Sequence, residues 1–298
     1  HFEAFQRLAR GEVEGYSVDR PYIRKDGRII WVHANGIVMY DTASHPRYVV
    51  AVVLDITERK REEERMQKRE EAVLMLATTQ SAKLDERIRQ VTEVAAEGLD
   101  VERVSVWLFT QDRLTIQCED LYIRSCHEHE RGRCLDCGHY PRYFAALERG
   151  VPIMADDART NPATAEFTGS YLERLDITSM LDVPIWVGGR QAGVVCHEHT
   201  GAARHWTSAD QEFAASLATT VALALEAEQR RLAEEVARES SERFRTMADN
   251  IPQLAWMTNE SGWTFWYNQR WLDFTGETLE ELRGWRWQRF LDPAHAMR

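Results

Sequence analysis

Alternating apolar and polar residues predict β-strands at the start of the chain. The Asp26-Gly27 dipeptide favours a tight hairpin because both positions tolerate a positive φ. Ile30, Val32 and Ala34 follow it with the alternation of a strand that buries one face. Residues 48–54 are rich in β-branched side chains, which is typical of a central strand. We therefore expect a small three-stranded sheet within residues 16–57.

The pattern becomes helical after residue 55. Met66, Val73 and Leu76 recur at heptad-like spacing among mixed charges. Such a stripe favours a helix that pairs with a copy of itself, and a solvated linker helix is the alternative. A break around 80–82 separates this helix from a second one with a single apolar face at 84–97.

Strand and helix patterns alternate through the middle of the chain. The strand patterns cover 101–110, 113–122, 179–187 and 191–199, and the short helices 140–149 and 164–175. A long helix follows Thr207, where Thr207 to Asp210 resembles a capping box with Asp in place of Glu or Gln. The last segment contains a further hairpin and six tryptophans, which we interpret as core packing.

Composition narrows the functional classes. The 298 residues carry a net charge of −11, and an acidic surface disfavours nucleic acid and anionic lipid, because both are polyanions. No stretch reaches the roughly 18 apolar residues of a membrane span, so no membrane contact is expected within the segment. Five cysteines do not resemble a secreted disulfide framework. We expect a cytoplasmic setting, with any membrane anchor outside the segment.

The segment 125–139 contains the side chains that bind zinc or iron. Cys134 and Cys137 form a C-x-x-C pair, which can bring two thiolates to one ion. Cys126, His127, His129 and His139 are the further candidate ligands. The same thiols fit a redox-sensing dithiol, and a polar loop with incidental thiols is the third interpretation.

Three groups of passages resemble known families. The sequences RKDGRIIWV at 24–32 and DITERK at 55–60 resemble the C-terminal half of a PAS domain. The passages at 244–252, 267–276 and 279–282 resemble the N-terminal half of a PAS domain. Between them, SMLDVPI at 179–185, GVVCHEH at 193–199 and RHW at 204–206 resemble a GAF domain.

The resemblance implies an α+β fold. It places a central GAF domain, an antiparallel sheet with flanking helices, between two partial PAS domains joined by long signalling helices. The expected parts are 1–57 (C-terminal part of a PAS domain), 58–80 (linker or coiled-coil helix), 81–228 (GAF domain), 229–243 (linker helix) and 244–298 (N-terminal part of a second PAS domain). The chain then looks like a piece of a longer protein whose output domain lies outside it, so no catalysis is expected from this segment itself.

The GAF resemblance also implies a pocket for an unknown small molecule between the sheet and its covering segments. In bilin-binding relatives a histidine near the position of His199 lines that pocket. Alternation places His197 on the same side of the strand, with Cys196 and Glu198 on the other. The predicted pocket residues are Tyr140, Tyr143, Phe144, Asp156, Asp157, His197 and His199, each of which could instead simply close the core.

Departures from the family patterns narrow the classes of ligand that we expect. Cys126-His127 resembles a bilin attachment pair, but it precedes the covering helix, and no cysteine stands at 175–177, where the bilin cysteine comes. Covalent bilin is therefore not expected. Asn161 is followed by Pro162, unlike the cyclic-nucleotide pattern Asn-Lys-Phe-Asp-Glu. Flavin is not expected either, because neither PAS-like half contains a cysteine.

The leading hypothesis for function is a sensory relay. Such arrays are typical of bacterial histidine kinases and cyclic-di-nucleotide enzymes, among which the histidine kinase is favoured over a diguanylate cyclase or phosphodiesterase. A small-ligand, metal or redox signal would bias the dimeric helices, because helices that enter and leave a small domain can transmit rotation or register shifts. The alternatives are a GAF-type free methionine sulfoxide reductase and a ligand-free dimerisation spacer.

Overall fold

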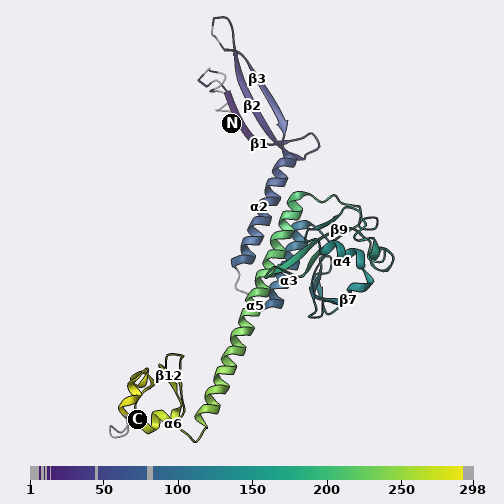
Figure 1. Ribbon diagram of the computed structural model, residues 1–298. Helices are drawn as coiled ribbons and strands as arrows, with labels where there is room; N and C mark the ends of the chain where they lie inside the picture. Colours follow the sequence, from purple (N-terminus) through teal and green to yellow (C-terminus); the bar gives the residue numbers. More distant parts are fainter. Residues whose placement is uncertain are drawn as a thin grey trace. The chain divides into compact units, whose positions relative to one another are not determined.

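The computed structural model describes residues 7, 10, 12, 13, 15–43, 46–78 and 83–290 (Figure 1). The fold is α+β, as predicted. The chain divides into two compact units, 1–225 and 226–298. The predicted break around 80–82 and the last eight residues lie outside the described part. No helix among the described residues is long and apolar enough to cross a membrane.

Three antiparallel strands follow one another at the start of the first unit. They are β1 (Gly15–Ile23), β2 (Ile29–Tyr40) and β3 (Pro46–Asp55), paired in the order β1-β2-β3. Gly27 takes a φ of 82° in the first hairpin, as the Asp26-Gly27 signal predicts. Thr57 begins the next helix: its Oγ1 donates to Asp55 at 2.6 Å and accepts from the Trp31 N–H at 2.9 Å. The Asp-Ile-Thr sequence thus ties the start of the helix to β2.

A second, seven-stranded antiparallel sheet forms the centre of the first unit. Its strands are β4 (Arg103–Phe109), β5 (Thr115–Ile123), β6 (Glu128–Glu130), β7 (Cys134–Asp136), β8 (Ile153–Ala155), β9 (Ile177–Val187) and β10 (Arg190–Thr200). The order is β6-β5-β4-β10-β9-β8, with β7 also paired to β5. Gly193 permits the central pairing, because a Cβ there would lie 2.0 Å from the carbonyl oxygen of Trp107.

Helices cover one face of this sheet and short irregular segments cover the other. Three helices lie side by side on the first face: α2 (Thr57–Thr78), α3 (Leu84–Leu99) and α5 (Ser208–Asp249) (Figure 1). On the other face are η1 (Cys137–His139), α4 (Pro141–Leu147), η2 (Ala165–Phe167) and the π-helical turn η3 (Thr168–Leu172). Each face has its own buried cluster, so the sheet separates two cores.

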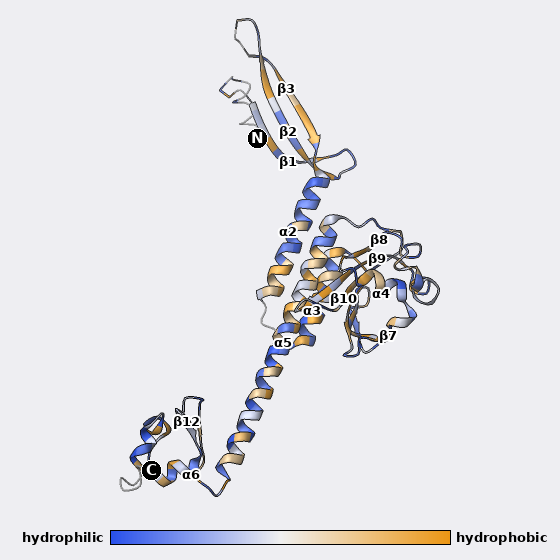
Figure 2. Ribbon diagram, viewed as in Figure 1, coloured by the Kyte–Doolittle hydropathy of each residue, from blue (hydrophilic) through white to orange (hydrophobic). Residues whose placement is uncertain are grey.

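The apolar stripe of α2 packs within the chain. Leu76 is 1% exposed in the core shared by α3 and α5, and Val73 packs against the same core, whereas Met66 is half-exposed. Figure 2 shows the matching change along α2, from a hydrophilic N-terminal part to an apolar C-terminal part. The interpretation of Leu76 as a residue that faces a second copy is therefore corrected, because the helix layer of this chain covers it, whereas Val73 is only partly buried.

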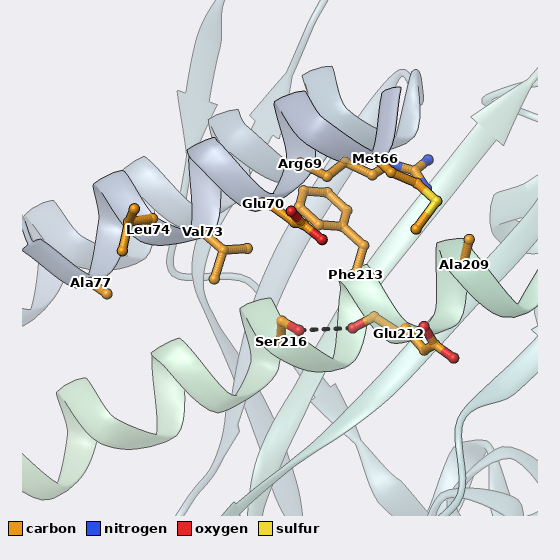
Figure 3. A pocket seen from close by; sticks show the side chains of 10 residues that line it. All are labelled: Met66, Arg69, Glu70, Val73, Leu74, Ala77, Ala209, Glu212, Phe213 and Ser216. Atoms are coloured by element: carbon orange, nitrogen blue, oxygen red, sulfur yellow. Dashed lines mark hydrogen bonds between the residues drawn. The ribbon is translucent and has the colours of Figure 1, made fainter. Parts of the chain in front are cut away.

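A groove of about 400 Å³ runs between α2 and α5 (Figure 3). Arg69 of α2 and Phe213 of α5 line it from the two helices, with the guanidinium 5.2 Å from the centre of the ring. The Arg69 side chain is buried and pairs with Asp210 at the start of α5. The groove thus lies along the contact that joins the two helices.

The second unit, residues 226–298, is the smaller of the two. After the end of α5 it contains β11 (Trp256–Thr258), β12 (Thr264–Tyr267), α6 (Gln269–Thr275), α7 (Leu279–Leu282) and η4 (Arg286–Phe290). Thr278 and Glu281 form the predicted capping box of α7. The interpretation of the tryptophans as core is wrong for Trp256 and Trp285, which are 50% and 51% exposed.

Candidate ligand pocket

A cavity of about 430 Å³ lies between the central sheet and the segments that cover its second face. Its walls come from strands β4, β5, β7, β9 and β10, from α4, and from the turns η2 and η3. The lining residues are Trp107, Ile116, Leu121, Arg133, Cys134, Leu135, Tyr140, Tyr143, Phe167, Ser170, Tyr171, Met180, Cys196 and Glu198. Its volume lies within the usual range for a small-molecule site, roughly 300–1,000 Å³.

Aromatic rings form the covering wall. Tyr140 stacks on Phe167 with ring centres 4.4 Å apart, and Tyr143 meets Phe167 edge-on at 4.9 Å. The two tyrosines are positioned by α4, where Pro141 occupies the first helical turn and Glu166 accepts from the Tyr143 N–H. Rings that pack in this way lose little mobility when a flat ligand binds against them.

Glu198 brings a buried carboxylate to the cavity from β10. The Arg103 Nε–H donates to it at 3.0 Å, and the Tyr171 hydroxyl donates at 2.9 Å. Burial raises the pKa of Glu198, while the positive charge of Arg103 opposes that rise. Burial acts to lower the pKa of Arg103, but the combined effects of Glu198 and Tyr171 outweigh it and raise that pKa. Arg103 and Glu198 therefore form a buried ion pair in the wall of the cavity.

A second buried acid, Asp182, lies on the neighbouring strand β9. The Tyr143 hydroxyl donates to its Oδ2 at 2.7 Å, and the sulfur of Cys196 lies 3.6 Å from the same hydroxyl. Asp182 Oδ1 is buried and has no hydrogen-bond partner within the described part of the chain. Burial raises the pKa of Asp182 to about 7, which is the expected result of removing a carboxylate from water.

The structure places six of the seven predicted pocket residues in three groups. Tyr140 and Tyr143 line the cavity. Phe144 packs beside them in the same core without lining it. Asp156, Asp157 and His199 lie away from the cavity: Asp156 accepts from the Trp206 N–H, Asp157 accepts from a backbone N–H in its own loop, and His199 is half-exposed near the end of β10.

The side assigned to His197 is corrected. Alternation along β10 is as predicted, but Cys196 and Glu198 are the residues that face the cavity. His197 lies on the helix side of the sheet, where its Nδ1–H donates to the Leu181 carbonyl oxygen at 2.7 Å. Burial lowers the pKa of His197 to about 4, so the ring is neutral at pH 7. The sequence shows the period of a strand, but not which face the covering segments occupy.

The Cys/His segment is divided between the two ends of β5. Cys134 in β7 lies opposite Gln117, and His129 in β6 lies opposite Tyr122, five residues further along β5. At about 3.4 Å per residue these positions are ~17 Å apart, which is too far for one ion whose ligands bind at about 2.3 Å. Among the described residues no group of three or more His, Cys, Asp or Glu side chains is placed to hold a metal ion.

The histidines of this segment have other partners. His129 contacts Asp120 through Nδ1 at 2.9 Å and Glu93 through Nε2 at 3.1 Å, which joins β6 to β5 and α3. His127 contacts the Tyr122 hydroxyl at 2.8 Å. His139 is exposed beside Asp136. The segment is therefore a sheet edge and, through Cys134 and Leu135, part of the cavity wall.

The five thiols differ in access and acidity. Cys126 and Cys134 are exposed, and Cys137 is half-buried. Burial raises the pKa of Cys118 to about 12, and burial together with the nearby Asp182 raises the pKa of Cys196 well above its usual value. A thiol held in its neutral form is a poor nucleophile.

Among the lining residues that were not predicted, Ser170 and Tyr171 were missed because the helix expected at 164–175 is irregular. The structure has a short 3-10 turn followed by the π-helical turn η3, which brings both Ser170 and Tyr171 to the cavity. Gly169 within that stretch is the one sequence signal for a break. Turns of this kind are frequent at functional sites, where they redirect side chains.

Models of known protein families match three segments of the chain. Residues 83–225 match the GAF domain family, residues 3–58 match a PAS domain family, and residues 242–297 match a second PAS domain family. The chain is therefore a PAS–GAF–PAS array, an arrangement typical of sensory signal-transduction proteins.

Individual proteins resemble parts of the chain. An uncharacterized protein, y4lL, of Sinorhizobium fredii is 37% identical over 59 residues, which are 20% of this chain and 7% of that protein. The GAF domain of a phosphoenolpyruvate-protein phosphotransferase from Coxiella burnetii aligns with a TM-score of 0.46 and 16% identity, over 57% of this chain and 96% of that one. The phycocyanobilin-bound GAF domain of a cyanobacterial phytochrome aligns with a TM-score of 0.45 and 18% identity, over 53% and 93%.

Proposed function

We propose that this segment senses a small molecule in the GAF pocket and relays its presence through α2 and α5 to an output domain outside the segment. One observation carries the proposal: β10 presents Cys196 and Glu198 to the cavity and Val195 and His197 to the helix layer, in alternation. A ligand that shifts this strand therefore acts on both faces of the sheet. Packed cores transmit such shifts because they are poorly compressible.

The contact between α2 and α5 provides the next step of the relay. Arg69 of α2 binds Asp210, which also accepts from the Thr207 N–H at 3.1 Å and so caps α5. Arg204, in the loop between β10 and α5, lies 3.3 Å from the same carboxylate. A displacement of β10 would reach this junction through a loop of only seven residues, 201–207.

The proposed assembly is a homodimer through the linker helices. The supporting feature is exposed apolar side chains on α5, namely Leu223, Leu232 and Val236, of which the last two continue the predicted stripe. A histidine kinase is the favoured output, in a cytoplasmic protein. A redox signal at Cys126 and Cys134, which are exposed, is the second input that we propose.

The two alternative functions have less support. A methionine sulfoxide reductase needs a reactive thiolate in the pocket, and burial raises the pKa of the pocket thiol Cys196. A ligand-free spacer would gain nothing from a cavity of about 430 Å³ with a buried ion pair in its wall. Both features favour a binding site.

A pocket-specific ligand screen tests the proposal. Ser170 is exposed at the cavity, so Ser170→Trp should fill the opening without disturbing the core, and Glu173→Trp adds the same ring to an exposed position outside the cavity. A panel of bacterial metabolites is tested by thermal shift on the full chain. We expect at least one compound to stabilise the wild type and Glu173→Trp but not Ser170→Trp. Stabilisation by no compound, or equal stabilisation of all three proteins, would contradict a ligand function of this cavity.

A further inference from the structure

The side of the cavity formed by Tyr143, Tyr171, Cys196 and Glu198 is called its inner end, and the tyrosine hydroxyl donors on this side are already used within the protein. Tyr143 and Tyr171 each have one hydroxyl proton, and they donate these to Asp182 and Glu198. The Cys196 sulfur lies 3.6 Å from the Tyr143 hydroxyl oxygen, which can accept from its thiol. What remains toward the cavity is acceptor capacity on the phenol oxygens and on Glu198, so a ligand that binds here must supply donors.

The charges at the inner end also favour a donor. Two acids, Asp182 and Glu198, are buried there with one buried base, Arg103. The other basic residue of the lining, Arg133, has a side chain that is 54% exposed and lies 2.6 Å from Glu130, so solvent screens its charge more than that of the buried Arg103. A positive group next to Glu198 would therefore meet a buried carboxylate, where a low dielectric strengthens the attraction.

The segments that cover the cavity contribute aromatic ring faces and edges to its wall. Tyr140 and Phe167 are stacked, while Tyr143 and Tyr171 meet Phe167 edge-on. Aromatic faces attract cations through the ring quadrupole, and a flat molecule can stack on them. Ring faces and a carboxylate that converge on one cavity are the elements of a site for an organic cation.

We infer that the pocket selects a flat aromatic molecule that carries a cationic, N–H-donating group, such as an amidine or an aminoheterocycle, with that group directed to Glu198. This inference rests on the proposed ligand function and specifies the chemical class of the ligand. It excludes carboxylates and phosphates as the group at the inner end. The bond from Tyr171 to Glu198 would weaken when the ligand binds, because both groups donate to the same carboxylate.

A charge series of matched shape tests the ligand class. Benzamidine, benzamide and benzoate differ in charge at nearly constant size, and their dissociation constants for the full chain can be measured by ligand-observed NMR. We expect benzamidine to bind at least about tenfold more tightly than benzamide, a difference of about 1.4 kcal/mol, and benzoate to bind most weakly. Equal or tighter binding of benzamide or benzoate would overturn the inference.

Two matched variants test whether the preference for benzamidine depends on the charge of Glu198. Glu198→Gln keeps an acceptor for Arg103 but removes the charge, and it should weaken benzamidine about tenfold while leaving benzamide unchanged. Glu173→Gln removes the same charge from an exposed position on the cover and should change neither. Benzamidine affinity that is unaffected in a folded Glu198→Gln protein would also overturn the inference. If that variant does not fold, the charge series on the wild type still decides.

The failure of this inference is distinguishable from failure of the proposed function. Tight binding of benzamide or benzoate that Ser170→Trp abolishes would reject the cationic class and keep the pocket as a ligand site. Binding of none of the three probes at 10 mM would reject the class, while the metabolite screen with Ser170→Trp would still decide the function. Benzamidine binding that Ser170→Trp leaves unchanged would reject the assignment to this cavity.

Discussion

Arg69 Nη2 donates to Asp210 Oδ1 at 2.6 Å, between two side chains that are both at least nine-tenths buried. Arg69 Nε also donates to the Gly98 carbonyl oxygen at 2.9 Å, near the C-terminus of α3. One side chain of α2 thus contacts α3 and α5 together. Burial acts to raise the pKa of Asp210, but hydrogen bonds from Thr207 and Arg69 outweigh it and hold that pKa below its usual range. The carboxylate is therefore charged at neutral pH.

Removal of the Arg69 charge should destabilise the first unit. Arg69→Met keeps most of the apolar stem but leaves Asp210 with Arg204 as its remaining basic partner at 3.3 Å. Because loss of one member of a buried ion pair costs about 3–5 kcal/mol and Arg204 compensates in part, we expect a loss of about 2–3 kcal/mol. Urea denaturation followed by circular dichroism measures this loss.

The control for this variant is one turn earlier in α2. Arg65 is exposed, and Arg65→Met makes the same chemical change outside the junction. It should alter the free energy of unfolding by less than about 0.5 kcal/mol. Similar losses for the two variants would show that the junction contributes no specific stability.

Gly98→Ala should also be destabilising, although alanine normally stabilises a helix by about 1 kcal/mol relative to glycine. A Cβ at Gly98 would lie 2.5 Å from Cε1 of Phe213, whose ring packs under Arg69. The expected loss is about 1–3 kcal/mol, because the ring must move within a filled core. Gly169→Ala is the control, since no atom lies within 4 Å of its added Cβ. Thermal denaturation of both variants compares them, and a stabilised Gly98→Ala protein would contradict the packing.

Two buried groups should give the stability of the GAF domain opposing dependences on pH. Asp182 has a raised pKa of about 7, so the folded state binds more protons than the unfolded state from about pH 4 to pH 7, and stability falls as pH rises. His197 has a lowered pKa of about 4, so between about pH 4 and 6.5 the unfolded state binds more protons, and stability rises with pH. The two effects offset each other over most of this range in the wild type.

Single variants should separate the two effects. In Asp182→Asn, His197 is the one of these two groups that still titrates. The free energy of unfolding should therefore increase from pH 4.5 to 6.5 more steeply than in the wild type. In His197→Gln it should decrease over the same range. The difference between the two variants should reach a few kcal/mol across the range. Parallel pH profiles of the two variants and the wild type would show that neither group titrates as its burial requires.

The accessibility of the five thiols gives a further prediction, which tests the redox-sensing and the methionine sulfoxide reductase hypotheses. With a chromogenic disulfide at pH 8, Cys126 and Cys134 should react rapidly, because they are exposed, and Cys137 more slowly, because burial raises its pKa. Cys118 and Cys196 should react only after denaturation, which exposes all five. Mass spectrometry assigns the modified residues. Rapid modification of Cys196 in the native protein would contradict its burial and reopen the reductase hypothesis.

More of the fold than of the candidate site could be predicted from the sequence. The Asp26-Gly27 hairpin, the strand alternation and the Thr207–Asp210 cap are local signals, and local backbone preferences decide them. Alternation on β10 was equally readable, yet it does not say which face is covered by helices, and His197 was therefore assigned to the wrong side. The C-x-x-C pair gave the residue types of a metal site, but the pairing of β6 and β7 to opposite ends of β5 is a long-range property.

Hydrogen exchange on the full chain, with and without saturating benzamidine, tests most directly whether the pocket is coupled to the helices. The account predicts slower exchange at 168–172 and in β10, together with altered exchange in α2 or at the start of α5 near Asp210, all of it absent in Ser170→Trp. Protection confined to the pocket, with α2 and α5 unchanged, would contradict the relay. No change in any segment would contradict benzamidine binding in this pocket.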